Sequence, residues 1–523
     1  MNTSHFCKTV VTAALVSWMA AGSAHATLVV SGKATKHVSC SAGVCTATAI
    51  SAVMNVSDLT TMLASSDVTL VSGSTAKDIE VKAAFSWTSA HRLTLDSYQA
   101  IAVDKPVTVA GTGALTLKAN DGGTGGNFLT QSPGRIAFWD TSSSLIINGI
   151  NYVLVADIAT LANDVASDYR GHYALADNYD AAADGVYANS PVLERLNGTF
   201  EGLGNRISHL SVVLPQPGRQ NIGLFSEIYG GTVENLTMTN STVENLGRNH
   251  RTGILVAYNL GTVRNVHVGG KIVVRDISKV GGLVGFNLGT IVLSSSAGVV
   301  DAGNGSVAGG LVGESEGQIL VSHSTTKVSI SARNFSTTTG RGAGGLVGLD
   351  GGTISESWAS GDVSISGGDA GQVTEAGGLI GASLSGATAT VSNSYSTGTA
   401  TVSMGGVGGF IGGGFFGSNA TIGLVDCYSV GVPSGTPSST VGGFIGEADM
   451  SEPISNVYWD LDTSGVSDPS QGAGNISNFP GISGLTDAQL KSGLPAGFDP
   501  GIWGQNPSIN NGYPYLIANP PAQ

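Results

Sequence analysis

The most chemically suggestive stretch of the sequence is Asp460-Leu-Asp-Thr-Ser-Gly465. It places side-chain oxygens at its first, third and fifth positions and Gly at the sixth, as calcium-binding loops do. The twelfth position is Gln471, where such loops carry a bidentate Glu, and no flanking helices are indicated. An Asx-rich turn is therefore favoured, and Ca2+ stays as the weaker alternative. The four candidate ligands are Asp460, Asp462, Ser464 and Asp468.

Two short motifs resemble nucleophile and nucleotide sites. Gly313-Glu-Ser-Glu-Gly317 matches the G-x-S-x-G pattern, which needs a sharp strand-to-helix turn with a His and an acid alongside. The same place in the preceding repeat is Gly285-Phe-Asn-Leu-Gly289, so we interpret the motif as a turn between repeats. Gly303-Asn-Gly-Ser-Val-Ala308 resembles a dinucleotide fingerprint but lacks a βαβ context. We predict no catalytic residue and no cofactor site.

Carboxylates raise the rival hypothesis of a polysaccharide lyase or glycosidase. Such enzymes need paired carboxylates, or an acidic metal cluster with a basic residue, on one face of neighbouring coils. The acidic residues in the repeats do not recur at matching offsets, and the spacing within 177–184 fits no standard metal loop. The residues considered are Glu314, Glu316, Glu356, Asp362, Arg341, Lys327, Asp177, Asp180 and Asp184.

The cysteines indicate an exported protein. Cys40 and Cys45 flank a Gly-containing turn and are predicted to form a small disulfide loop in an oxidising compartment. Cys427 is predicted to be a buried small residue instead of a reactive thiol, because free Cys is among the most buried residue types. No further Cys or His pair stands at zinc-ligand spacing.

Composition excludes several classes of protein. The 523 residues include 77 Gly, only 11% are charged and 41% are hydrophobic, which argues against a disordered chain. The net charge of −14 makes nucleic acid and anionic membranes poor partners. Residues 1–26 have the layout of a secretory signal peptide, and no later stretch is apolar for the ~18 residues that a membrane span needs.

A recurring phrase is the strongest signal in the sequence. Gly-Leu-Val-Gly or a close variant occurs eight times, and its leading glycines are 28 to 35 residues apart. A Gly-Thr-Ile type phrase follows each copy, so each unit reads as two or three short strands separated by turns. Units that stack about 4.8 Å apart form a parallel β-helix, in which glycines permit positive-φ corners. The repeat-defining glycines include Gly282, Gly285, Gly310, Gly313, Gly345, Gly348, Gly378, Gly381, Gly409, Gly412, Gly443 and Gly446.

Two residue types recur at fixed places in the units. Trp358, Tyr395, Tyr428 and Tyr458 form either a carbohydrate-stacking stripe or steps of the core, and we favour the core. Asparagines follow the Val or Ile of the second phrase by two residues, and we expect them to stack as a ladder inside the coil. These are Asn235, Asn265, Asn393 and Asn456.

The repeats resemble the GLUG repeat of large bacterial surface proteins of the filamentous hemagglutinin type. The resemblance agrees with the all-β, right-handed parallel β-helix expected from the repeats. Short flanking helices are predicted at 157–169 by the apolar spacing of Ile158, Leu161 and Val165, and after Thr486 by a capping box with Gln489. The expected organisation is a signal peptide (1–26), hemagglutinin-like rungs (27–150), an α+β connecting or capping segment (151–215), the GLUG-repeat β-helix (216–460) and a C-terminal cap (461–523).

From the resemblance and the absence of a convergent active site we expect an exported, non-catalytic adhesin. Its expected location is the cell surface, the outer membrane or the extracellular space. Its expected partners are cell-surface glycans or proteins, with an outer-membrane transporter for export. The alternatives are the lyase or glycosidase described above and a structural spacer or matrix protein.

Overall fold

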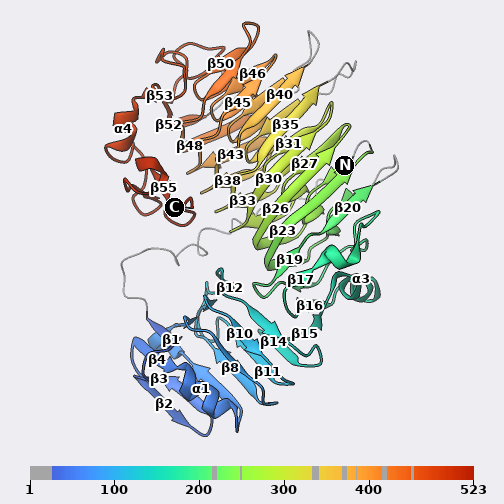
Figure 1. Ribbon diagram of the computed structural model, residues 1–523. Helices are drawn as coiled ribbons and strands as arrows, with labels where there is room; N and C mark the ends of the chain where they lie inside the picture. The colour runs from blue at the N-terminus through green and yellow to red at the C-terminus, as the bar shows by residue number, and fades with distance from the viewer. Residues whose placement is uncertain are drawn as a thin grey trace, which may run out of the picture.

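The computed structural model describes residues 26–214, 221–247, 250–332, 341–367, 374–384, 386–414, 421–448 and 453–522. Over these residues the chain is built almost entirely of short β-strands, most of them paired in parallel with the strand one coil later (Figure 1). The expected all-β, solenoid-like fold of stacked parallel strands is thus confirmed. The predicted signal peptide lies, apart from Ala26, outside the described residues.

Residues 27–147 form a first stack, drawn in blue to cyan in Figure 1. Its coils pair in parallel register, for example Ile79 with Ile101 and Leu93 with Leu115. Alternate residues of each strand point inward, so Leu, Ile and Val fill the coil. The strands of its three sheets are β4 (Ser51–Asn55), β1 (Thr27–Ser31), β6 (Asp78–Val81), β9 (Ile101–Val103) and β12 (Phe128–Thr130); β7 (Phe85–Trp87), β10 (Val107–Val109) and β13 (Ile136–Phe138); and β3 (Val44–Ala47), β5 (Val68–Val71), β8 (Arg92–Asp96), β11 (Ala114–Lys118) and β14 (Ser144–Ile147).

Helices and a hairpin complete the first stack. Helix α1 (Val56–Leu63) begins at Asn55, whose side chain accepts hydrogen bonds from the first-turn amides, and buries Leu59 and Leu63. The hairpin of β2 (Val38–Ser41) and β3 is antiparallel. A short helix, α2 (Gly73–Ala76), follows β5.

A connecting segment leads into the second stack. Strand β15 (Ile150–Val155) pairs antiparallel with β14 and parallel with β16 (His172–Leu175). Helix α3 (Ile158–Ser167) confirms the helix expected there, capped by Asp157 and packed through Ile158, Leu161 and Val165. The segment continues through β17 (Tyr179–Asp180), η1 (Ala181–Asp184), β18 (Thr199–Glu201), β19 (Arg206–Ser208) and β20 (Ser211–Leu214).

Residues 221–460, together with a last strand at 482–485, form the second stack, which contains the eight copies of the repeated phrase. Each copy runs from a strand of one eight-stranded sheet into a strand of another, and equivalent residues pair, as Val284, Val312 and Val347 do. The first sheet contains β21 (Asn221–Ile222), β24 (His250–Thr252), β27 (Ser278–Gly281), β31 (Val307–Gly309), β36 (Arg341–Gly344), β41 (Thr374–Gly377), β46 (Gly406–Gly408) and β50 (Thr440–Gly442), and the second contains β22 (Phe225–Ile228), β25 (Val256–Asn259), β28 (Val284–Asn287), β32 (Val312–Ser315), β37 (Val347–Asp350), β42 (Ile380–Ser383), β47 (Ile411–Gly413) and β51 (Ile445–Glu447).

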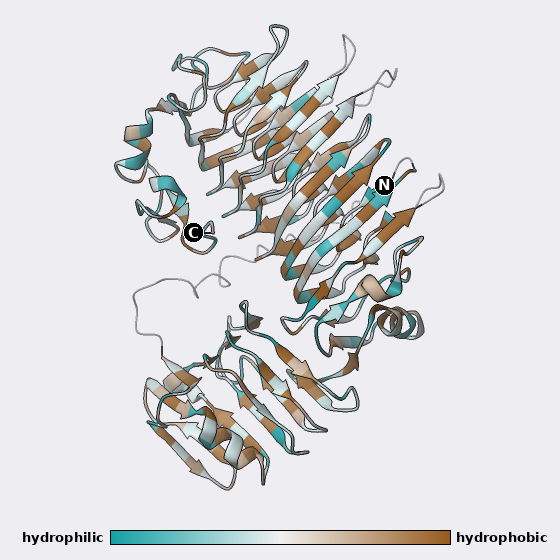
Figure 2. Cartoon of the chain, viewed as in Figure 1, coloured by the Kyte–Doolittle hydropathy of each residue, from teal (hydrophilic) through white to brown (hydrophobic). Residues whose placement is uncertain are grey.

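A longer wall closes each coil of the second stack. Apolar residues alternate with polar ones along its strands, as the hydropathy colouring shows (Figure 2). Its strands are β23 (Thr232–Asn245), β26 (Thr262–Val274), β29 (Thr290–Val292), β30 (Ser295–Ala302), β33 (Gln318–Leu320), β34 (His323–Ser324), β35 (Lys327–Ala332), β38 (Thr353–Ser355), β39 (Trp358–Ala359), β40 (Val363–Gly367), β43 (Thr388–Ser392), β44 (Tyr395–Ser396), β45 (Ala400–Val402), β48 (Thr421–Ser429), β49 (Pro433–Gly435), β52 (Ile454–Asp460) and β53 (Ile482–Leu485).

The repeat glycines serve close packing instead of positive-φ corners, contrary to the expectation above. None of the twelve repeat-defining glycines has a positive φ. A methyl group at Gly285 would lie 2.5 Å from the Thr252 backbone nitrogen, and one at Gly412 would lie 2.5 Å from that of Ala376. The two eight-stranded sheets therefore face each other at a distance that leaves no room for a Cβ.

The left-handed corners occur elsewhere, two residues after the buried Val, Ile or Leu of the second phrase. The four ladder asparagines occupy such corners because Asn tolerates positive φ better than most residues. They face outward and not into the coil, so the ladder expected inside it is wrong in place, although Asn265 does donate to Asn235. The corner residues are Asn235, Asn265, Leu293, Val321, Glu356, Asn393, Asp426 and Asn456, with φ between 46° and 56°.

A serine ladder runs inside the coil beside these corners. The Ser322 hydroxyl accepts a hydrogen bond from the Ser294 amide and donates to the Leu320 carbonyl, and Ser357 and Ser394 repeat this pattern in the next coils. Cys427 takes the next position and is fully buried, as predicted for it. Its thiol donates to the Val425 carbonyl as the serines do to theirs.

The C-terminal segment, residues 461–522, covers one flank of the second stack (red in Figure 1). Helix α4 (Asp487–Lys491) has the capping box expected of Thr486 and Gln489. Further elements are β54 (Trp503–Gly504), η2 (Asn510–Gly512) and β55 (Tyr515–Leu516). Among the described helices, none has the length and apolar character that crossing a bilayer requires.

Candidate functional site

A cleft of about 640 Å3 lies between the two stacks. One wall is the turn at 131–135, which follows β12 of the first stack. The floor consists of corner residues and their neighbours in β23, β26 and β34, and residues 518–520 form the far end. Because segments from three parts of the chain line the cleft, no local sequence motif marks it.

Hydrogen bonds between the stacks hold the cleft open in a defined shape. The side-chain amide of Asn265 donates to the backbone carbonyl of Thr130 (2.9 Å), and the backbone N–H of Thr130 donates to Asn235 Oδ1 (3.3 Å). The Arg264 guanidinium reaches Asn127 Oδ1 at 2.7 Å. Such preorganisation lowers the cost of ordering a site when a ligand binds.

Part of the floor belongs to a column of polar residues from successive coils, which we call the floor column: Arg206, Thr237, His267, Ser295 and His323, all of which line the cleft except Ser295. Parallel register places neighbours about 4.8 Å apart. His267 Nδ1 lies 2.8 Å from Ser295 Oγ, and His323 Nδ1 lies 2.8 Å from Asn519 Oδ1. Burial lowers the pKa of the His323 imidazole to about 4, so this ring is neutral near pH 7.

A pair of carboxylates lies beside the cleft, and the sequence analysis missed it. Glu201 and Glu234 pair in register on adjacent coils. Glu234 accepts from Arg264 Nε at 3.0 Å, whereas Glu201 is buried and accepts from the Leu203 and Asn235 nitrogens. Burial and the Glu234 charge raise the pKa of Glu201 well above its usual range. The available signal is the equivalence of Thr199-Phe-Glu201 and Thr232-Val-Glu234, of which only the second lies within the repeats that the sequence shows.

Past the cleft, the floor column continues as a stack of aromatic rings. Trp358, Tyr395 and Tyr428 are buried, but they point outward from the coil and are covered by the C-terminal segment. The three rings belong to a hydrophobic cluster that is separate from the interior of the coil. The prediction that they are buried is therefore confirmed, but the prediction that they point into the coil is wrong. In this structure the stripe is not open to a ligand, because Trp503 and Phe498 lie against the rings.

The candidate calcium ligands make turn hydrogen bonds. Asp460 Oδ1 accepts from the Asp462 and Thr463 amides, which is the favoured Asx turn. Asp468 accepts from the Ser470 amide, and Ser464 Oγ faces the Val466 carbonyl. In the part of the chain that the structure describes, no three His, Cys, Asp or Glu side chains are grouped as metal ligands would be.

The other candidate residues do not converge on one site. Ser315 ends strand β32 and is fully buried, so the turn predicted for it is wrong; it accepts from Asn287 Nδ2 at 3.2 Å in a buried polar column. Glu314 pairs with Lys279 at 2.7 Å, and Asp362 accepts from the Thr399 hydroxyl. Each acid of the 177–184 group has its own partner: Asp177 pairs with Arg135, Asp180 with His209, and Asp184 with Tyr187.

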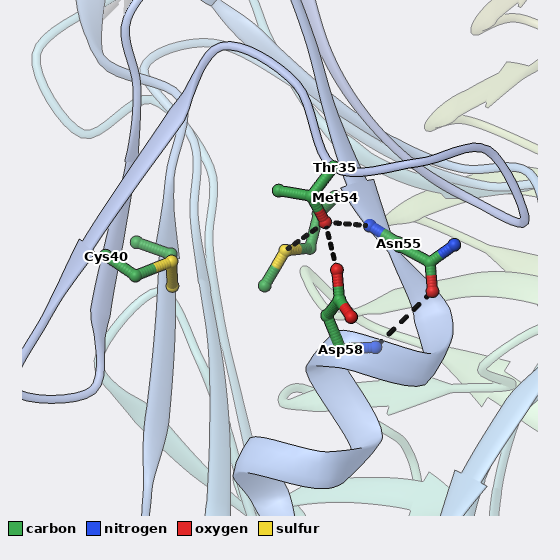
Figure 3. Close-up of a disulfide and its surroundings, with 6 residues drawn as sticks. Thr35, Cys40, Met54, Asn55 and Asp58 are labelled. Atoms are coloured by element: carbon green, nitrogen blue, oxygen red, sulfur yellow. Dashed lines mark hydrogen bonds between the residues drawn. A yellow bond between two sulfur atoms is a disulfide. The ribbon is translucent and has the colours of Figure 1, made fainter.

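Cys40 and Cys45 form a disulfide across the β2–β3 hairpin, close to the start of α1 (Figure 3). Near it, the Thr35 hydroxyl donates to Asp58 Oδ2 (2.5 Å) and accepts from the Asn55 amide (3.1 Å). These contacts tie the residues before the hairpin to the start of helix α1.

Comparison with known proteins gives little guidance on function. No family model matches the chain. Halomucin from Haloquadratum walsbyi is 34% identical over 130 residues, which is 23% of this chain and 1% of halomucin, so the matched part spans only a small fraction of that protein. The crystal structure of a candidate immunoglobulin A1 protease from Bacteroides ovatus is 16% identical, with a TM-score of 0.33, over 71% of this chain and 92% of that one.

Proposed function

We propose that the protein is an exported, non-catalytic adhesin: a right-handed parallel β-helix of GLUG-type repeats that acts at the cell surface or after secretion. The cleft between the stacks is its binding site for cell-surface glycans or proteins. The observation that carries the proposal is the preorganised lining of the cleft, which sets amide, imidazole and guanidinium groups into a mostly apolar surface on a rigid scaffold.

The lining suits a glycan in particular. Arg206, Thr237 and the neutral His323 supply both donors and acceptors, which matches the hydroxyl groups of sugars. Equal spacing along the floor column repeats similar contacts at intervals, as an extended chain of sugar units would require.

Binding of the secreted form, residues 27–523, to cells and to a glycan panel tests the proposal. A Thr237→Trp variant would fill the cleft from its floor, and Thr242→Trp is the matched control, because both residues lie half-buried on β23 but only Thr237 lines the cleft. We expect Thr237→Trp to abolish binding and Thr242→Trp to retain it. An unmodified protein that binds neither cells nor glycans would overturn the proposal in favour of a spacer role.

A second candidate, polysaccharide degradation, is supported by one observation, the adjacent Glu201 and Glu234 with their different surroundings. Assaying new reducing ends and unsaturated sugars after incubation with a polysaccharide panel distinguishes the two. We expect no products. Product release that disappears in Glu234→Gln would replace the adhesin proposal with an enzyme.

A further inference from the structure

The charge of the cleft differs from that of the whole chain. Acidic residues outnumber basic ones by 37 to 23 in the sequence. The described residues that line the cleft nevertheless include no Asp or Glu, while two Arg and two His are among them. A lining without acids, in an acidic protein, points to a ligand that acids would repel.

Three carboxylates beside the cleft carry little free negative charge. Asp177 is paired with Arg135, and Glu234 with Arg264. Burial favours the protonated, neutral form of Glu201. These three carboxylates thus add little negative potential to the cleft.

Arg206 supplies an uncompensated positive charge. It is exposed at the start of the floor column, and its guanidinium makes no hydrogen bond or ion pair with any described residue. Arg135, in contrast, already bonds Asp177 and Asn205. A free guanidinium presents donors in a fork that fits a carboxylate or sulfate with two parallel hydrogen bonds.

We propose that the cleft binds an acidic polysaccharide, one that carries carboxylate or sulfate groups, and that Arg206 anchors an acidic group while the rest of the floor column contacts sugar hydroxyls. This inference rests on the proposed function and names its ligand class. The overall negative charge does not oppose it strongly, because salt at physiological strength screens charges beyond about 8 Å.

Titration calorimetry with polygalacturonate, and with the same polymer fully methyl-esterified, tests the anchor. Sulfated heparin serves as a second acidic probe. The esterified polymer keeps the backbone and removes the charge. We expect the protein to bind at least one acidic probe about tenfold or more tightly than the ester, and to lose most of that preference in Arg206→Gln. Arg206→Lys keeps the positive charge but not the forked pair of donors, so its preference for the acidic probe should lie between those of the unmodified protein and Arg206→Gln.

Arg275→Gln is the control, because Arg275 is an exposed arginine just past the far end of β26, outside the cleft lining. It should leave the affinity unchanged. Equal binding of acid and ester, or an unaltered affinity in Arg206→Gln, would overturn the inference. If Thr237→Trp still abolished binding of neutral glycans or cells in that case, the adhesin proposal would stand while the ligand class fell; loss of all binding in the unmodified protein would remove both.

Discussion

His323 lies face to face on Trp358, with ring centroids 4.4 Å apart and planes within 2° of parallel. The pair marks the boundary between the open cleft and the covered aromatic stack, because His323 lines the cleft and the Trp358 indole donates to the Asn519 carbonyl of the C-terminal segment (2.8 Å). A single column of equivalent residues therefore serves two purposes: its polar part faces solvent, and its aromatic part holds the chain end in place.

Two tyrosines of this column should respond differently to removal of the hydroxyl. The Tyr428 hydroxyl donates to the Pro514 carbonyl at 2.6 Å, whereas the buried Tyr395 hydroxyl has no partner among the described residues. We expect Tyr428→Phe to lower stability by about 1 kcal/mol, and Tyr395→Phe to be neutral or stabilising. Chemical denaturation followed by tryptophan fluorescence measures both; a larger loss for Tyr395→Phe would contradict the assignment.

Adding a methyl group at a repeat glycine should destabilise the second stack. In Gly285→Ala the new Cβ would meet the Thr252 backbone nitrogen at 2.5 Å, and a backbone cannot move aside as a side chain can. We expect a loss of about 1–3 kcal/mol or more, seen as a lower melting temperature. Gly493→Ala is the matched control, because nothing lies within 4 Å of its added Cβ, and it should melt like the unmodified protein.

Asp350 should make stability depend on pH. Burial raises the pKa of its carboxyl to about 7, from about 3.9 in an unfolded chain, so the folded state holds the proton more tightly. The protonated carboxyl therefore adds its full contribution to the free energy of unfolding below about pH 4. Between about pH 4 and pH 7 that contribution falls by about 1.4 kcal/mol per pH unit, and above about pH 7 it changes no further.

The variant Asp350→Asn tests this dependence. Asn287 holds the same position two coils earlier and Asn259 three coils earlier, so the amide fits the column. We expect the variant to match the unmodified protein near pH 4 and to exceed its stability by an amount on the order of a few kcal/mol at pH 7.5. If the free energies of unfolding of the two proteins differed by the same amount at every pH in this range, the assignment of the pH dependence to Asp350 would be refuted.

Cys427 should be inert and replaceable. Burial raises the pKa of its thiol to about 12, and the thiolate is the reactive form. In the secreted form we expect no labelling by a thiol reagent at pH 8 until the protein is unfolded. Cys427→Ser should change stability by less than about 1 kcal/mol, because serine holds the same place in four preceding coils. Rapid labelling of the native protein would show the burial to be wrong.

The sequence predicts the stacked parallel fold because each repeat carries the same small set of glycines and branched residues at the same offsets. It predicts the two short helices because their caps, Asp157 and Thr486, are local signals. Side-chain direction was less accessible: a period shows that Trp358, Tyr395 and Tyr428 are equivalent, but burial on an outer face depends on a segment far along the chain.

The cleft lay beyond sequence reasoning for the same reason. Asn265 and Thr130 are 135 residues apart, and Asn519 and Ser322 are 197 apart, yet each pair is joined by a hydrogen bond. Two stacks and a returning tail must fold before these groups meet. The positive-φ corners expected at the repeat glycines occur instead at the asparagines expected inside the coil. The sequence shows which residues tolerate a positive φ but not which of them adopt it.

The backbone contact at Gly285, Gly313, Gly348 and Gly381 has an evolutionary consequence. Each coil meets the next through the same surface, so a coil duplicated or deleted by recombination would find a fitting neighbour without any compensating substitution. At this contact the stack can thus change length in steps of one coil, but a coil added or removed between Ser322 and Tyr428 would also displace the side chains on which the C-terminal segment packs.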